Sequence, residues 1–328
     1  RLNYVYLYIN KELYIIYIMN DISLETCIGD IRLENCLMNA SGCNCQFLSD
    51  LLEIDKSHSA AVVSKSCSIN NRLGNPLPRY YHNEYLSINS MGLPNEGYRY
   101  YMDAANSIQK PYIMSISSQA VYEDISIIET ACMGNTAGIE VNVSCPNIVG
   151  DPQLSYSFDR LEEFLRKMFE YAKYEKEIGI KLSPYFDTSH FNTAFDILNM
   201  FRTDITFLTC INGIGNGLYI DLEKEETMIK PKNGLGGLGG SIVKPTGLAN
   251  VSLFSDNTNF DIVGCGGICT GKDAFEYILC GAKAVQIGTQ LVKEGTDVFT
   301  RIDSELKKIM YDKHYNSLGY FRGCLRYK

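Results

Sequence analysis

The stretch Gly138-Ile139-Glu140-Val141-Asn142-Val143-Ser144-Cys145-Pro146-Asn147 joins an apolar run to a polar turn. Residues 138–143 predict a short buried strand, which Pro146 ends because proline cannot continue a sheet ladder. Barrel enzymes keep their active sites at the carboxyl ends of such strands. Cys145 therefore has two interpretations, a catalytic thiol on a loop or a buried structural cysteine.

Short apolar runs and amphipathic stretches alternate along the rest of the chain. The predicted strands are residues 36–40, 60–65, 112–117, 138–143, 179–182, 206–211, 261–264 and 284–287. The predicted helices include residues 47–55, 122–133, 158–174, 191–201 and 272–280. This alternation predicts an α/β fold, a (β/α)8 TIM barrel. Residues 66–95 and 212–246 are too long for simple turns, so we expect long active-site insertions after strands 2 and 6.

Composition narrows the class of partner. The chain has 328 residues and a net charge of -8, which disfavours nucleic acid and favours a small molecule. Its twelve cysteines are irregularly spaced and include no Cys-x-x-Cys pair, which indicates reduced thiols in a cytoplasmic protein. With four histidines and no ligand-like spacing, we expect no metal site.

The first eighteen residues differ from the rest. They are rich in tyrosine and isoleucine, but Lys11 and Glu12 interrupt them and they are too short to span a bilayer. We therefore expect no membrane association. Residues 1–18 are interpreted as an N-terminal appendage of unknown role, and residues 19–328 as one barrel domain.

Glycine-rich turns predict a phosphate site. Gly264-Cys265-Gly266-Gly267 follows the seventh predicted strand and Ile287-Gly288-Thr289 follows the eighth, where barrels commonly bind phosphate. The glycine-rich run of residues 234–240 is not a P-loop, because no Gly-Lys-Ser/Thr ends it. Within that run, Gly239 and Gly240 are the candidates for ligand contact.

Two lysines lie inside strand-like runs rather than on polar faces. They are Lys65 and Lys181. A lysine that points into a barrel needs an anionic partner, because an unpaired buried ammonium is costly. Each is a candidate Schiff-base nucleophile, phosphate anchor or fixed charge beside a cofactor, and a strand-end lysine reaching solvent is the alternative.

Several motifs occur together in a specific order. They are Asn39-Ala40-Ser41-Gly42, Ser64-Lys65-Ser66, Gly74-Asn75-Pro76-Leu77-Pro78-Arg79-Tyr80, Ile88-Asn89-Ser90-Met91-Gly92-Leu93-Pro94-Asn95, Asn142-Val143-Ser144-Cys145-Pro146-Asn147 and Ile214-Gly215-Asn216-Gly217-Leu218. With them, the chain from about residue 20 onward resembles the dihydroorotate dehydrogenase family. The cysteine at position 145 resembles the soluble class 1A enzymes, which use FMN and reduce fumarate. Class 2 enzymes place serine there, and class 1B enzymes need a partner subunit.

The resemblance implies a division of the site between cofactor and substrate. The residues implied to contact FMN are Ala40, Ser41, Lys65, Ser66, Asn142, Lys181 and Ile211, with Gly240, Gly266, Gly267, Gly288 and Thr289 around its phosphate. The residues implied to line the dihydroorotate site are Lys65, Asn89, Ser90, Met91, Gly92, Leu93, Asn142, Asn147, Asn212 and Gly213. Asparagines suit a cyclic amide-imide because they present donors and acceptors, while a lysine balances its carboxylate.

The implied reaction converts dihydroorotate to orotate in pyrimidine biosynthesis and fumarate to succinate. Cys145 is the expected base that removes the substrate proton, and Lys181 is expected to stabilise negative charge on the reduced flavin. Cysteine thiols ionise near pH 8.5, so flavin reduction should become faster as the pH rises. The family also implies a homodimer, with residues 212–246 as candidates for its interface.

Two positions depart from the family pattern. Gly213 stands where class 1A enzymes usually have serine, and Cys265 where threonine is frequent. Three alternatives remain: another FMN barrel acting on a pyrimidine, such as a dihydropyrimidine dehydrogenase-like enzyme; a lyase or aldolase with a Schiff base on Lys65 or Lys181; and a non-catalytic flavin-binding relative.

Overall fold

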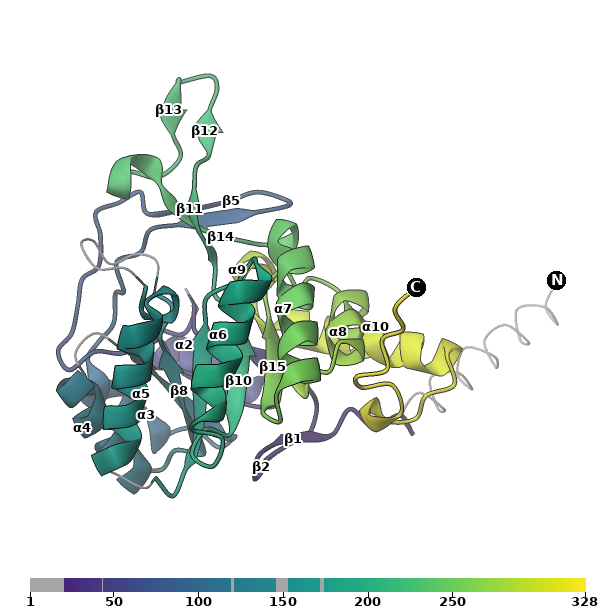
Figure 1. The fold of residues 1–328 in the computed structure, drawn as a ribbon. Helices are drawn as coiled ribbons and strands as arrows, with labels where there is room; N and C mark the ends of the chain where they lie inside the picture. Colours follow the sequence, from purple (N-terminus) through teal and green to yellow (C-terminus); the bar gives the residue numbers. More distant parts are fainter. Residues whose placement is uncertain (1–20, 43, 119–120, 146–152, 172–173) are drawn as a thin grey trace.

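A ring of eight parallel strands forms the centre of the chain (Figure 1). The structure, a computed structural model, describes residues 21–42, 44–118, 121–145, 153–171 and 174–328. The strands are β3 (Leu37–Asn39), β4 (Val62–Val63), β7 (Tyr112–Ser117), β8 (Gly138–Asn142), β9 (Glu177–Leu182), β10 (Phe207–Cys210), β15 (Asp261–Cys265) and β16 (Ala284–Ile287). They pair in the order β3-β16-β15-β10-β9-β8-β7-β4, and a bridge between Met38 and Ala61 links the two ends. The predicted TIM barrel is confirmed.

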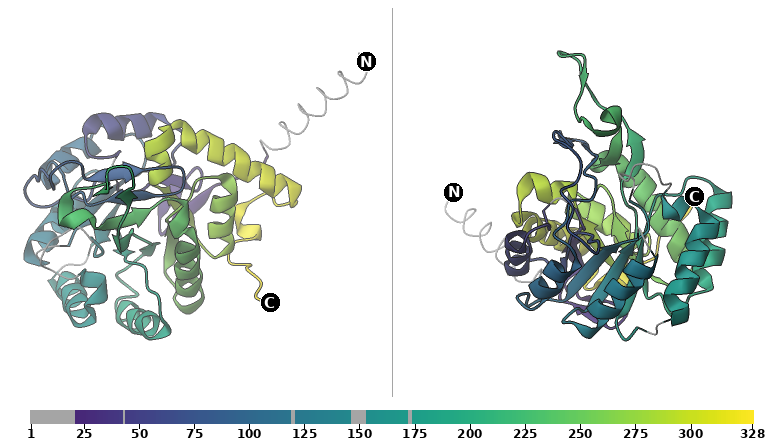
Figure 2. Two further views of the ribbon diagram at one scale, coloured as in Figure 1. Left: turned by 90° about the horizontal axis from the view of Figure 1, so that it is seen from above. Right: turned by 90° about the vertical axis from the view of Figure 1, so that its left-hand side faces the viewer.

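Helices surround this barrel on its outside (Figure 2). They are α2 (Leu48–Lys56), α3 (Tyr98–Ala105), α4 (Val121–Met133), α5 (Phe158–Tyr171), α6 (Thr188–Asn199), α7 (Lys244–Asn257), α8 (Gly271–Leu279), α9 (Thr289–Glu294) and α10 (Asp297–Asp312), with 3-10 turns η1 (Leu154–Tyr156), η2 (Pro231–Gly234), η3 (Ser241–Val243) and η4 (Leu318–Tyr320). The five predicted helices are confirmed as α2, α4, α5, α6 and α8. In the part of the chain that the structure describes, no helix is long and apolar enough to cross a membrane.

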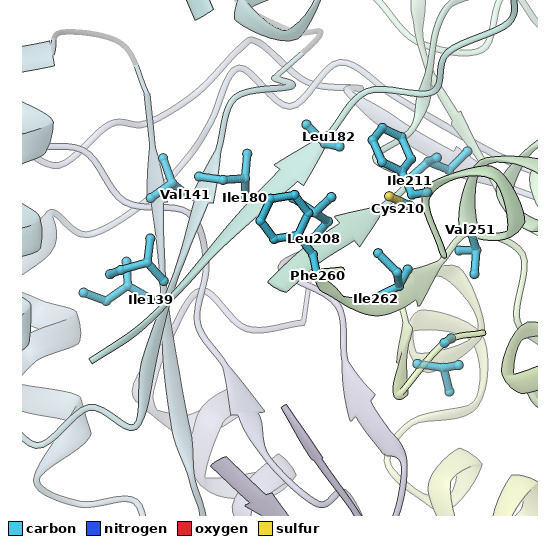
Figure 3. Packing of buried hydrophobic residues seen from close by; sticks show 14 of the residues in the cluster. Ile139, Val141, Ile180, Leu182, Leu208, Cys210, Ile211, Val251, Phe260 and Ile262 are labelled. Carbon is cyan, nitrogen blue, oxygen red and sulfur yellow. The ribbon is translucent and has the colours of Figure 1, made fainter. Parts of the chain in front are cut away.

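The outer faces of the strands pack against these helices. Ile139 and Val141 of β8, Ile180 and Leu182 of β9 and Leu208 of β10 belong to one buried apolar cluster (Figure 3). They alternate with residues that point into the barrel, because successive side chains of a strand face opposite sides. The alternation explains why the strands are apolar on one face and carry polar residues on the other.

The lower part of the barrel interior is apolar. Ile113, Phe207 and Val263 meet there in a second buried cluster that also contains the antiparallel hairpin β1 (Thr26–Ile28) and β2 (Ile31–Leu33). The hairpin covers the amino-terminal end of the barrel, where it lies below the strands in Figure 1. This layer is a packed core, so ligands must bind at the opposite end.

One glycine in this layer has a clear packing reason. A Cβ atom on Gly179 would lie 2.1 Å from a ring carbon of Phe207. We expect Gly179→Ala to lower the free energy of unfolding by about 1–3 kcal/mol, because overpacking forces shifts in a close-packed core. Urea denaturation measures the change. Gly319→Ala is the control, since a Cβ atom there would lie 3.9 Å from the hydroxyl oxygen of Ser317. Equal stability of both variants would contradict the packing argument.

The two long insertions form one additional sheet. β5 (Tyr80–His82) and β6 (Ser87–Asn89) come from the first insertion, β11 (Ile214–Gly217) and β14 (Gly236–Gly239) from the second. They pair in the order β11-β14-β6-β5, so the contact between β6 and β14 joins both insertions. A small hairpin, β12 (Ile220–Asp221) and β13 (Glu226–Thr227), extends outward from this sheet (Figure 1). Sequence patterns predicted the insertions but not their pairing.

Candidate active site

An open pocket lies between the carboxyl ends of the barrel strands and the insertion sheet. The residues that line it on the barrel side end or follow β3, β4, β8, β9, β10, β15 and β16, whereas Asn89, Leu238 and Gly239 come from the insertion sheet. Among its described lining residues, two are lysines and none is acidic. Such a pocket favours an anionic ligand.

Most of the predicted site residues meet in this pocket. Those predicted for the cofactor all line it: Ala40, Ser41, Lys65, Ser66, Asn142, Lys181, Ile211, Gly240, Gly266, Gly267, Gly288 and Thr289. Those predicted for the catalytic base and the substrate that line it are Lys65, Asn89, Met91, Leu93, Asn142, Cys145, Asn212 and Gly213. Segments far apart in the sequence are therefore brought to one place, although their roles stay predictions.

Two described residues among those predicted for the substrate, Ser90 and Gly92, lie elsewhere. Ser90 is buried, and its backbone carbonyl oxygen accepts a hydrogen bond from the Asn75 amide at 2.9 Å. Gly92 has a φ of 70°, and a Cβ atom there would lie 2.4 Å from the Asn75 side chain. Both residues thus pack within the first insertion rather than line the pocket. Asn147 lies outside the described residues.

The predicted phosphate turn is a close approach of three backbone segments. A Cβ atom on Gly267 would lie 2.8 Å from the carbonyl oxygen of Gly240 and 2.9 Å from the backbone nitrogen of Lys244, and its φ is 74°. Only glycine fits this position without strain. Asp273 holds the following residues, since its carboxylate accepts hydrogen bonds from the backbone nitrogens of Cys269 at 2.9 Å and Thr270 at 2.8 Å. The result is a preformed neutral cradle.

Lys181 has an internal anionic partner. Its Nζ lies 3.4 Å from Oε1 of Glu140 and donates to Oε1 of Gln286 at 2.8 Å. Burial has the largest single effect on the pKa of Lys181 and lowers it. The attraction and hydrogen bonding of the Glu140 carboxylate, together with the charges of Cys265 and Cys45, hold the pKa above its ordinary value. An ammonium that keeps its proton is a poor Schiff-base nucleophile, so this geometry disfavours the lyase alternative at Lys181.

Lys65 is placed differently. It is 8% exposed, lines the pocket, and its Nζ donates to the carbonyl oxygen of Gly42 at 2.9 Å. Within the described part of the chain, no carboxylate lies within 4.0 Å of its ammonium. A buried cation without a charged partner is costly, so Lys65 is the group that an anionic ligand would neutralise.

Two asparagine side chains are fixed by Ser144. The Oδ1 of Asn142 accepts from the Ser144 backbone nitrogen at 3.1 Å and from its hydroxyl at 2.9 Å. The Nδ2 of Asn212 donates to the Ser144 carbonyl oxygen at 3.2 Å and to its hydroxyl at 2.9 Å. Since a backbone nitrogen can only donate and a carbonyl oxygen can only accept, both amides have a defined orientation.

A chain of hydroxyl groups connects the asparagines with the predicted cofactor side. Ser66 Oγ lies 3.1 Å from Ser41 Oγ and 2.9 Å from Ser115 Oγ, and it accepts from Nδ2 of Asn142 at 3.1 Å. The strand ends of β3, β4, β7 and β8 are thereby held in one network. Cys145, which lines the pocket and is half-buried, follows Ser144 directly, so this network also fixes the start of its loop.

Gly213, the departure from the family pattern, lies against the insertion sheet. A Cβ atom there would come 2.9 Å from the carbonyl oxygen of Leu238 in β14. A serine at this position would therefore require β14 to move by a few tenths of an ångström. The glycine is consistent with the close approach of the insertion sheet to the barrel in this chain.

Sequence reasoning missed several polar residues of the site. Glu140, Thr209 and Gln286 lie inside the barrel beneath Lys181, and Ser115 and Ser144 complete the networks above. A signal for Glu140 was present, because it lies two residues before Asn142 in the same strand and therefore shares its face.

The fold and the pocket define this chain as a (β/α)8-barrel protein with a lysine-containing ligand pocket at the carboxyl ends of its strands. The family model described as Dihydroorotate dehydrogenase matches residues 23–310, so the chain belongs to the dihydroorotate dehydrogenase family.

Individual relatives agree with this family. The chain is 46% identical over 297 residues to a dihydroorotate dehydrogenase (fumarate) of Lachancea kluyveri, covering 88% of this chain and 93% of the relative. It is 46% identical over 299 residues to a putative dihydroorotate dehydrogenase A (fumarate) of Streptococcus pyogenes, covering 89% and 94%. A crystal structure of DHODH from Eimeria tenella in complex with ferulenol has the same fold, with a TM-score of 0.76, 19% identity and coverage of 92% and 88%.

Proposed function

We propose that this chain oxidises dihydroorotate to orotate in pyrimidine biosynthesis and passes the electrons through FMN to fumarate, which gives succinate. The observation that carries the proposal is the meeting of Lys65, Asn142, Asn212 and Cys145 at one pocket, in a chain 46% identical to relatives named for the fumarate-dependent enzyme. This assignment corresponds to class 1A of the family, in which Cys145 occupies the position of the base.

The described residues fit a flavin mononucleotide. The cradle of Gly240, Gly266 and Gly267 offers a neutral backbone surface, which suits a phosphate. A Cβ atom would lie 2.6 Å from a backbone oxygen at Gly240 and 2.8 Å from one at Gly267. Lys65 and Lys181 supply positive charge elsewhere in the same pocket. When bound, FMN accepts a hydride from one substrate and delivers it to the next.

The substrate has its own complement on the protein. Its carboxylate would neutralise Lys65, the buried ammonium without a carboxylate partner among the described residues. Asn142 has its Oδ1 occupied by Ser144 and donates one Nδ2 hydrogen to Ser66 Oγ, so the second Nδ2 hydrogen is the one that would reach a ligand carbonyl. Asn212 uses Nδ2 on Ser144, and its Oδ1 accepts from the Gly213 backbone nitrogen at 2.8 Å, so the second lone pair of Oδ1 is the one that would accept from a ring N–H. The pair therefore matches a ring with neighbouring carbonyl and amide groups.

Cys145 would remove the proton from the carbon next to the one that loses the hydride. A positioned base typically contributes 10²- to 10⁴-fold to such a step. In the second half-reaction, in which fumarate becomes succinate, the same thiol would donate a proton to fumarate. One pocket then serves both substrates in turn, and ping-pong kinetics are expected.

Two assays test the proposal. Heat-released flavin from the purified protein should be FMN, and steady-state turnover of dihydroorotate should be faster with fumarate than with a quinone or NAD⁺. Turnover of uracil or dihydrouracil in place of dihydroorotate would support the pyrimidine oxidoreductase alternative. A colourless protein that borohydride inactivates in the presence of a carbonyl substrate would support the lyase alternative.

We also propose, from the family, that the chain acts as a cytoplasmic homodimer with residues 19–328 as its FMN-binding catalytic domain. Exposed apolar side chains on the insertion sheet and its hairpin support an interface there; they include Leu218, Ile220 and Leu222. Light scattering at micromolar concentration measures the mass.

A further inference from the structure

A layer of four polar side chains fills the barrel interior between the pocket and the apolar core. They are Glu140 of β8, Lys181 of β9, Thr209 of β10 and Gln286 of β16, each at most 3% exposed. Lys181 lines the pocket, whereas the other three lie beneath it and line no part of it. The family site described above does not use these three residues.

Glu140 is the centre of this layer. Its Oε2 accepts hydrogen bonds from Nε2 of Gln286 at 2.6 Å and from the hydroxyl of Thr209 at 2.9 Å, and its Oε1 lies 3.4 Å from Nζ of Lys181. Gln286 also accepts from Lys181 through Oε1 at 2.8 Å, so it bridges the two charges. The hydrogen-bond partners leave Glu140 one defined orientation.

The layer as a whole is close to neutral. Glu140 is 0% exposed, and a carboxylate buried to this extent requires a cation and hydrogen bonds. The ammonium of Lys181 lies 3.4 Å from this carboxylate, and Glu140 is the first among the groups that raise the pKa of Lys181 against the effect of its burial. The electrostatic field in the pocket is therefore that of a Lys181–Glu140 ion pair, which is weaker than the field of an isolated Lys181 ammonium.

We propose that Glu140 is a positioning residue that serves as the internal counterion of Lys181 and thereby lowers the reduction potential of the bound flavin. This inference rests on the proposed FMN site. A cation beside a flavin favours its reduced form, which carries additional negative charge. A carboxylate behind that cation cancels part of its field, and the cancellation is strong where water is excluded.

The test removes the negative charge of Glu140 without changing the size of its side chain. Glu140→Gln keeps the volume and removes the carboxylate. The midpoint potential of its flavin is measured at pH 6, since a low pH favours the protonated form of Lys181 once its counterion is gone. We expect the equilibrium constant for two-electron reduction to rise at least about tenfold, which corresponds to an increase of about 30 mV. Thr209→Val is the matched control, because it removes a hydrogen bond to Glu140 without a change of charge.

A charge exchange guards against a variant that fails to fold. In Glu140→Gln combined with Gln286→Glu, the carboxylate moves to the other partner of Lys181. Lys181 still donates to position 286, and the bond between positions 140 and 286 forms with donor and acceptor reversed. This double variant should bind flavin with a potential close to that of the original protein. A potential far from it would overturn the proposal, whether or not Glu140→Gln can be purified.

The other possible results of the potential measurements can also be told apart. An unchanged potential in Glu140→Gln, or an equal increase in Thr209→Val, would overturn the counterion role. The potential is measured with a chemical reductant, so it does not depend on dihydroorotate turnover. A protein that holds FMN but does not oxidise dihydroorotate would therefore refute the proposed function alone, and one that holds no flavin would refute both.

Discussion

Cys145→Ala should slow the reduction of the bound flavin by dihydroorotate by roughly 10²- to 10⁴-fold. The reason is that the carbon next to the hydride donor must lose a proton, and Cys145 is the thiol that follows the fixed Ser144 at the mouth of the pocket. Stopped-flow absorbance under anaerobic conditions measures the rate. The affinity for orotate should change little, since the variant retains Lys65 and both asparagines.

The pH dependence gives a second readout of the same variant. With the thiol present, the reduction rate should rise with pH, because only the thiolate accepts the proton. That dependence should disappear in Cys145→Ala. Cys132→Ala is the control, because Cys132 has intermediate burial like Cys145 but lies outside the pocket. A normal reduction rate in Cys145→Ala would remove the thiol from the chemistry.

Lys65→Ala should weaken orotate binding by roughly 10- to 100-fold, the effect of losing a charged hydrogen bond. Within the described residues, Lys65 has no carboxylate partner, so the carboxylate of the ligand should supply most of its stabilisation. Spectral titration of the bound flavin with orotate measures the dissociation constant. Because Lys65 is also a predicted FMN contact, the flavin content of the variant is measured first.

The preference for orotate over uracil distinguishes a carboxylate-binding role of Lys65 from a general disruption of the site. The original protein should prefer orotate over uracil, which lacks the carboxylate, and Lys65→Ala should lose that preference. Lys272→Met is the control for a loss of positive charge, because Lys272 is exposed on α8. Unchanged discrimination between the two ligands would mean that another group holds the carboxylate.

The fold was largely predictable because its signals are local. Each barrel strand is a short apolar run, and the strand at residues 138–142 differs from the predicted 138–143 by a single residue. α7 was less predictable, since Pro245 and Gly247 interrupt its pattern and its apolar residues do not gather on one face. The pairing of β6 with β14 was not predictable, because it joins segments that are distant in sequence.

The site residues also fall into those that could be predicted from the sequence and those that could not. Lys65 and Lys181 were recognisable as lysines inside strands, and this position led to the expectation that each needs an anionic partner. The structure separates them, since Glu140 satisfies Lys181 from within the barrel whereas Lys65 faces the pocket. This difference depends on which strands neighbour one another and on the direction of each side chain, and single-strand patterns do not contain it.

The most direct test of the central claim is a two-step anaerobic titration of the purified yellow protein. Dihydroorotate should bleach the flavin absorbance, and fumarate added afterwards should restore it and yield succinate. Fumarate should act faster than a quinone or NAD⁺ at equal concentration. If dihydroorotate leaves the flavin oxidised, or if fumarate leaves the bleached protein reduced, the account of this active site is contradicted.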